Sequence, residues 1–89
     1  TEDIIRLEAQ GKYTDIYCER GKMLTSSKNI GEFVEMLNPK TFVKIHRSHL
    51  VNSDKILKYL KTDGGTLIMK DEKELPVSKS GKERLFELL

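Results

Sequence analysis

The spacing of apolar residues constrains this chain more than any other feature of its sequence. One segment has the i, i+3, i+4, i+7 spacing of a buried helical stripe, and it runs from Ile30 to Leu37. Ser27 or Asn29 can cap the start of this helix, and Pro39 prevents its continuation. The other apolar residues form short runs bounded by turn-forming residues, which is typical of β-strands. The pattern therefore predicts a β-rich domain.

Strands are expected in seven short segments, over residues 4–7, 13–18, 22–25, 42–50, 55–60, 66–69 and 74–77. The stretch Thr62-Asp63-Gly64-Gly65 contains an Asp-Gly pair, a strong hairpin signal, and residues 51–54 have the composition of a turn or short 3₁₀ segment.

A second helix is predicted at the end of the chain. Ser80 and Glu83 match a capping box, and Leu85, Leu88 and Leu89 form an apolar stripe after it. Because the two helical segments do not alternate with strands, we expect antiparallel sheets rather than a parallel βαβ layout.

Length and composition limit the functions that this chain can have. A chain of 89 residues is expected to form one domain, and a single cysteine, Cys18, excludes a disulfide framework and favours a reducing, cytoplasmic setting. No apolar run is long enough to cross a membrane. Residues 38–61 carry one acidic and six basic side chains, and the latter are Lys40, Lys44, Arg47, Lys55, Lys58 and Lys61. This asymmetry suggests an anionic partner, although a solvated lysine-rich face would have the same composition.

Four consecutive polar residues, His46 to His49, interrupt an apolar segment that runs from Phe42 to Asn52. A buried strand does not tolerate such a run without hydrogen-bonding partners, so a partly exposed loop or bend is expected here. Arg47 within it is well suited to donate to a guanine edge or to a phosphate.

The string F-V-K-I-H-R-S-H-L-V-N at residues 42–52 resembles the central signature of the LytTR family of DNA-binding domains. Weaker matches lie in the right order on both sides of it. They are Leu7-Glu8-Ala9 with Gly11, Tyr13 and Thr14 upstream, the helix with Ile30 and Leu37, and Leu75-Pro76-Val77-Ser78-Lys79 downstream. The resemblance covers essentially the whole chain.

This resemblance implies a mainly β, elongated antiparallel fold with two short helices, whose loops read bases in the major groove of double-stranded DNA. Family members are typically output domains of bacterial two-component response regulators, and they bind direct repeats in promoters. We therefore expect residues 1–89 to be one DNA-binding domain of a longer regulator with an N-terminal receiver domain. Dimer formation on DNA stays open.

The resemblance also implies three base-contacting positions, one in each of three loops, and these match Thr14, Arg47 and Lys79. Phosphate contacts are expected from the polar residues around them, because such contacts position a protein while base contacts select the sequence. These residues are Lys12, Tyr13, Ser48, Ser78, Ser80 and Lys82. A helix starting at Ser80 would add free backbone N–H groups.

Two functions other than DNA binding are compatible with parts of the sequence. A protein-interaction module could use edge strands and the terminal helix. A metal or catalytic site could use His46, His49 and Cys18, but the His-x-x-His spacing is not that of a helical zinc site, and no nearby carboxylate completes it. We therefore expect no enzymatic activity, no metal and no cofactor. Structural roles are expected for His46 at the core edge and for Asn52 in a turn.

Overall fold

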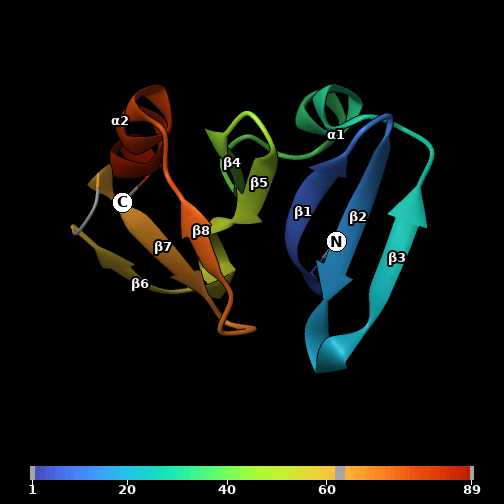
Figure 1. Cartoon of the computed structure of the whole chain (residues 1–89), viewed down its shortest axis with the longest axis horizontal. Helices are drawn as coiled ribbons and strands as arrows, with labels where there is room; N and C mark the ends of the chain where they lie inside the picture. Colours follow the sequence, from blue (N-terminus) through green and yellow to red (C-terminus); the bar gives the residue numbers. More distant parts are fainter. Residues whose placement is uncertain (1, 62–63, 89) are drawn as a thin grey trace.

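The computed structural model describes residues 2–61 and 64–88, and within these ranges it has two antiparallel sheets and two α-helices (Figure 1). The elements follow in the order β1 (Ile4–Gln10), β2 (Tyr13–Cys18), β3 (Met23–Ser26), α1 (Ile30–Met36), β4 (Phe42–His46), β5 (His49–Asn52), β6 (Ile56–Leu60), β7 (Thr66–Met69), β8 (Glu74–Pro76) and α2 (Lys79–Leu88). Short 3₁₀ turns, η1 (Glu19–Gly21) and η2 (Ser53–Lys55), follow β2 and β5. Thr62, Asp63 and Leu89, which the sequence assigned to a hairpin turn and a helical stripe, lie outside the described residues.

The five-stranded sheet has the order β3-β2-β1-β5-β4 and the three-stranded sheet the order β6-β7-β8, with antiparallel pairing throughout. This confirms the predicted β-rich antiparallel fold with two helices. The overall extents of 33 × 25 × 23 Å make the domain moderately elongated.

The segment 42–50 was predicted as one strand, and it is a hairpin instead. Arg47 and Ser48 form the turn between β4 and β5, so the predicted bend within the polar run is confirmed. The prediction of a turn at Val51 and Asn52 was wrong, because both residues belong to β5. Val51 is fully buried between β1 and β4, and the 3₁₀ turn begins only at Ser53.

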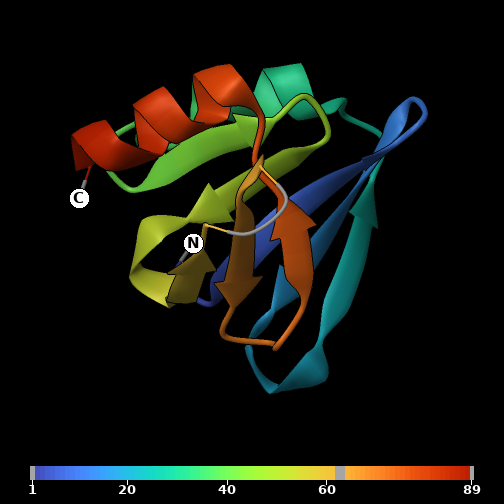
Figure 2. The same ribbon diagram turned by 60° about the vertical axis from the view of Figure 1, so that its left-hand side comes forward.

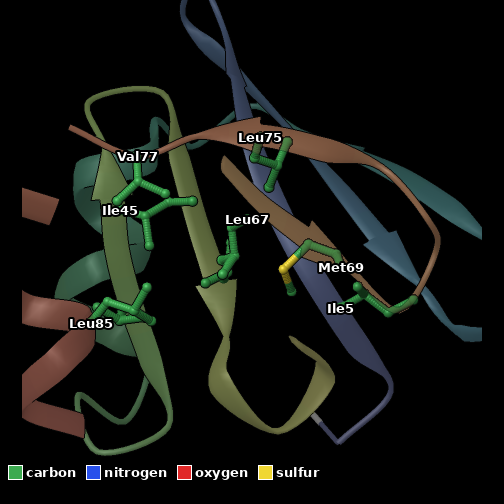
Figure 3. Packing of buried hydrophobic residues seen from close by; sticks show 9 residues of the cluster. Ile5, Ile45, Leu67, Met69, Leu75, Val77 and Leu85 are labelled. Atoms are coloured by element: carbon green, nitrogen blue, oxygen red, sulfur yellow. The ribbon is translucent and has the colours of Figure 1, made fainter. Parts of the chain in front are cut away.

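Side chains of β1, β4 and β5 are buried on both faces of the five-stranded sheet, whereas the edge strand β3 is largely exposed. On one face α1 covers a cluster made of Leu7, Ile30, Phe33, Phe42 and Leu50. The opposite face packs against the three-stranded sheet and α2 (Figures 2 and 3). This larger cluster contains Ile5, Val43, Ile45, Val51, Leu67, Met69, Leu75, Val77 and Leu85.

The first helix is closed at its start by Asn29, one of the two predicted caps. The N–H of Glu32 donates to Asn29 Oδ1 at 3.0 Å, and the N–H of Asn29 donates to Glu32 Oε2 at 2.8 Å. This reciprocal pair satisfies two of the backbone donors that a helix start leaves free. Ile30 and Phe33 can then point into the cluster beneath.

Two groups of ionic contacts tie the sheets together. The guanidinium of Arg6, only 4% exposed, donates to Asp71 in the β7–β8 turn and to Glu8 on its own strand, both at 3.0 Å. It also lies 3.8 Å from the centre of the Tyr17 ring. Near the β2–β3 connection, Glu19 binds Lys55 at 2.6 Å, and the hydrogen bond from Lys55 lowers the pKa of Glu19.

The second helix is held against β4 by a joint between Ser78 and the carbonyl of Ile45. The N–H and the hydroxyl of Ser78 both donate to this oxygen, at 2.8 and 3.2 Å, and the N–H of Gly81 donates to Ser78 Oγ at 3.0 Å. Ser78 is thus the cap of α2, so the predicted capping box at Ser80 and Glu83 was wrong. Figure 2 shows α2 lying along β4 as a result.

This close packing depends on Gly81, because a Cβ atom there would lie 2.0 Å from the oxygen of Ile45. We expect Gly81→Ala to lower the free energy of unfolding by about 2–3 kcal/mol, since a backbone carbonyl cannot move aside as a flexible side chain would. Urea denaturation followed by circular dichroism measures this loss.

Gly31→Ala in α1 is the matched control. Its Cβ would meet only the side-chain oxygen of Asn29, at 3.2 Å. We expect a change within about 1 kcal/mol in either direction. Equal stability changes for the two variants would contradict the importance of close packing at Gly81.

Candidate nucleic-acid interface

Three connections that are distant in the sequence meet at one end of the domain (Figures 1 and 2). They are the β1–β2 turn at Gly11 and Lys12, the β4–β5 turn, and the β8–α2 junction at Ser78. The N–H of Ala9 beside the first turn donates to Ser48 O at 2.9 Å, and Ser78 binds the carbonyl of Ile45 in β4. Backbone hydrogen bonds therefore connect the three in a row. We call this end the loop edge.

The side chain of Arg47 is exposed at the tip of the central turn. Beside it lies a hollow of about 290 Å³, between the β4–β5 hairpin and the start of α2. The lining residues are Lys44, His46, Arg47, Ser78, Ser80 and Arg84, which include three cations and no carboxylate. Arg84 is oriented by a hydrogen bond from Nη1 to the carbonyl of Lys44, at 3.1 Å. Such a surface attracts anions.

Thr14 is placed differently from what the resemblance implied. Its side chain is 0% exposed, and its hydroxyl donates to the carbonyl of Lys28 at 2.8 Å. A buried hydroxyl with its proton committed cannot reach a base edge in this conformation. We therefore expect a structural role for Thr14, because its hydrogen bond ties β2 to the segment before α1.

The neighbouring turn residues are the accessible ones. Lys12 and Tyr13 are exposed, Tyr13 to 55%. Tyr13 faces outward because it is the first residue of β2, opposite Gln10 across the turn. Tyr17 and Tyr59, by contrast, are half-buried.

The other predicted residues lie at or beside the α2 start. Lys79 and Ser80 are exposed and Lys82 is half-buried. The hydroxyl of Ser78 is less available, because it donates to Ile45 O and accepts from Gly81. Ser48 is half-buried in the central turn.

The basic character of residues 38–61 is divided between the two ends of the domain. Lys44 and Arg47 lie at the loop edge. Lys55 is instead paired with Glu19, which follows β2 at the end opposite to the β1–β2 turn. Arg84 of α2, which the sequence reading did not select, joins the loop edge through folding alone.

The two histidines flank the central turn. His46 Nδ1 accepts a hydrogen bond from the N–H of Ser48 at 3.1 Å, which confirms a structural role for His46. The rings of His46 and His49 lie 5.3 Å apart. Burial lowers the pKa of His49, although Glu8, 3.9 Å from its Nδ1, acts in the opposite direction. Within residues 2–61 and 64–88 there is no group of three or more potential metal ligands of the His, Cys, Asp or Glu type.

Asn52 has the structural role expected of it. Its Oδ1 accepts from the N–H of Asp54 at 2.9 Å, and its Nδ2 donates to the carbonyl of Ile4 at 2.8 Å. It therefore caps the start of η2 and also fixes the start of β1.

Among the described helices, none has the length and apolar character needed to span a membrane.

Fold and site together define the class of protein: a small β-rich domain with a cationic hollow at its loop edge, a surface typical of nucleic-acid-binding domains. The model of the LytTr DNA-binding domain family matches residues 1–89, and the chain belongs to this family. A solved LytTr DNA-binding domain, of a putative methyl-accepting/DNA response regulator from Bacillus cereus, superposes with a TM-score of 0.86 at 27% identity, covering 98% of this chain and 81% of that one.

Two curated relatives extend the comparison. The heme-containing CO-sensing transcriptional regulators RcoM 1 and RcoM 2 of Paraburkholderia xenovorans are each 30% identical to this chain over 91 residues. The match covers 99% of this chain but spans only 34% of the length of either regulator.

The structural role of Thr14 can be tested with Thr14→Val, which preserves shape and removes the hydrogen bond to Lys28. We expect the free energy of unfolding to fall by about 1 kcal/mol, while DNA sequence preference is unchanged. Thermal unfolding and selection on random duplexes measure the two effects. An altered base preference at unchanged stability would restore Thr14 as a reading residue.

Proposed function

We propose that this domain binds double-stranded DNA sequence-specifically, as the output domain of a bacterial transcription regulator, with the loop edge in the major groove. One observation supports this above all others. An exposed arginine on a tight turn stands beside a hollow that contains two more cations, and flanking turns lie on either side of it. In such an arrangement the arginine can reach base edges in a groove while the cations beside it meet phosphates.

Within this proposal Arg47 reads a base, because its guanidinium can donate two parallel hydrogen bonds to a guanine. Lys79 contributes at the α2 start, more through charge than through geometry. Lys12 and Tyr13 replace Thr14 as the contacts from the first turn. Phosphates are bound by Ser48, Ser80 and Lys82, and Ser78 mainly caps the helix.

The domain is proposed to act without a cofactor and without catalysis, in the cytoplasm. Residues 1–89 would form one domain of a longer protein, in which a receiver domain supplies the signal. Two copies would occupy direct repeats in a promoter. The structural similarity to a domain of a putative response regulator supports this context.

In vitro selection from random duplexes tests the function directly. We expect recovery of a pair of short motifs spaced by about one helical turn, roughly 10 base pairs. The competing function, a protein-interaction module, is tested by fluorescence anisotropy with random duplex DNA at low salt. Absence of binding at micromolar protein would contradict DNA binding and favour that module.

Arg47→Ala is expected to weaken binding to the selected duplex by about 1–3 kcal/mol and to relax the preference at one base pair. Arg47→Lys is the matched control, because it keeps the charge but loses the planar fork. We expect it to retain binding to random DNA and to lose the base preference. Equal affinity of Arg47→Ala and wild type for the selected site would exclude Arg47 from base reading.

Lys82→Ala is expected to weaken all duplexes alike and to reduce the salt slope of the binding constant by about one unit, as for the loss of one phosphate contact. Affinity is measured at several salt concentrations. Lys22→Ala, at the β2–β3 connection on the far end of β2, is the control and should leave the slope unchanged. The same slope change in both variants would rule out a specific contact from Lys82.

A further inference from the structure

We infer that His46 is a positioning residue for DNA binding: its unprotonated Nδ1 holds the turn that presents Arg47, so the domain binds DNA more tightly when His46 is neutral. This inference rests on the proposed function. The hydrogen bond from the N–H of Ser48 to His46 Nδ1, at 3.1 Å, spans the turn. An imidazole nitrogen accepts a hydrogen bond only through a free lone pair, so the ring proton belongs on Nε2.

The turn depends on this bond because the strand pairing around it is irregular. The register of β4 against β5 shifts between Lys44 and His46. The Ser48 backbone is therefore held mainly by two contacts. Its N–H donates to His46, and its carbonyl accepts from the N–H of Ala9, at 2.9 Å. Protonation of His46 would place a hydrogen on Nδ1, opposite the Ser48 N–H, and would remove the first contact.

Charged groups face the His46 ring from several elements. Lys44 and Arg47 line the same hollow from the hairpin, and Arg84 lines it from α2. On the β5 side the ring contacts His49, and beyond His49 lies Glu8 of β1.

The surroundings make the two possible roles of His46 distinguishable. If His46 bound phosphate as a cation, acidic pH would strengthen DNA binding. If it holds the turn as a neutral acceptor, acidic pH weakens binding. The direction of the pH effect therefore decides between charge and positioning, whereas a loss of affinity at one pH would not.

Two substitutions isolate the acceptor. His46→Asn places an oxygen near the position of Nδ1 and cannot be protonated in the range tested, while His46→Gln moves its amide one bond further out. Affinity for the selected duplex is measured at constant salt at pH 7.5 and 5.5. His49 is present in both variants and in the wild type, so its titration contributes to all three proteins.

At pH 7.5 we expect His46→Asn to bind within about 3-fold of the wild type and His46→Gln to bind roughly 3- to 10-fold more weakly, the range for loss of one hydrogen bond. On acidification to pH 5.5 the affinity of the wild type should fall by a similar factor relative to the affinity of His46→Asn. Equal losses of affinity in His46→Asn and His46→Gln at pH 7.5 would overturn the inference. So would a ratio of wild-type to His46→Asn affinity that stays constant or rises on acidification to pH 5.5.

A second measurement needs no DNA. Nitrogen-15 NMR of the free wild-type domain should show the tautomer with a bare Nδ1 at pH 7.5, and the Ser48 amide resonance should shift as His46 is protonated. A proton on Nδ1 at pH 7.5 would refute the role of His46. If the wild type bound no duplex at any pH, the proposed function would fail, and this spectrum would still decide whether His46 holds the turn.

Discussion

The loop edge depends on one shared acceptor, the carbonyl oxygen of Ile45. It receives both the N–H and the hydroxyl of Ser78, and the same hydroxyl caps α2 through the N–H of Gly81. This joint brings the last connection of the chain beside the central hairpin. It works only because Gly81 has no side chain, so the first turn of α2 can touch the β4 backbone. The hollow with Arg84 and Lys44 is a direct consequence.

The rest of the fold makes this joint rigid. The five-stranded sheet is covered on one face by α1 and on the other by the second sheet and α2, so even a short chain has two apolar clusters. Arg6 links the two sheets through Asp71 and also pairs with Glu8 on its own strand, and a buried charge of this kind is tolerable because its donors are paired. Turns mounted on such a scaffold can present side chains with little freedom to lose on binding.

Local patterns predicted the features that local physics decides. The apolar stripe of α1, its Asn29 cap and the polar bend before His49 all followed from a few adjacent residues. The errors concern contacts between distant segments. Thr14 follows the β1–β2 turn closely, but its hydroxyl donates to the carbonyl of Lys28 once β2 and the segment before α1 are packed together. Ser78 rather than Ser80 caps α2, because only Ser78 also meets the carbonyl of Ile45.

The distribution of charge also separates what adjacent residues predict from what contacts between distant segments decide. The six basic residues between positions 38 and 61 suggested one cationic surface, yet Lys55 is neutralised by Glu19 at the opposite end of the domain. The cations that line the hollow come instead from β4, its turn and α2. A DNA phosphate is attracted by positive charges that lie within about 8–10 Å of it in space, whatever their separation along the sequence. The proposed interface is therefore a product of the strand order and the α2 joint, and the composition of one segment only suggests that the partner is an anion.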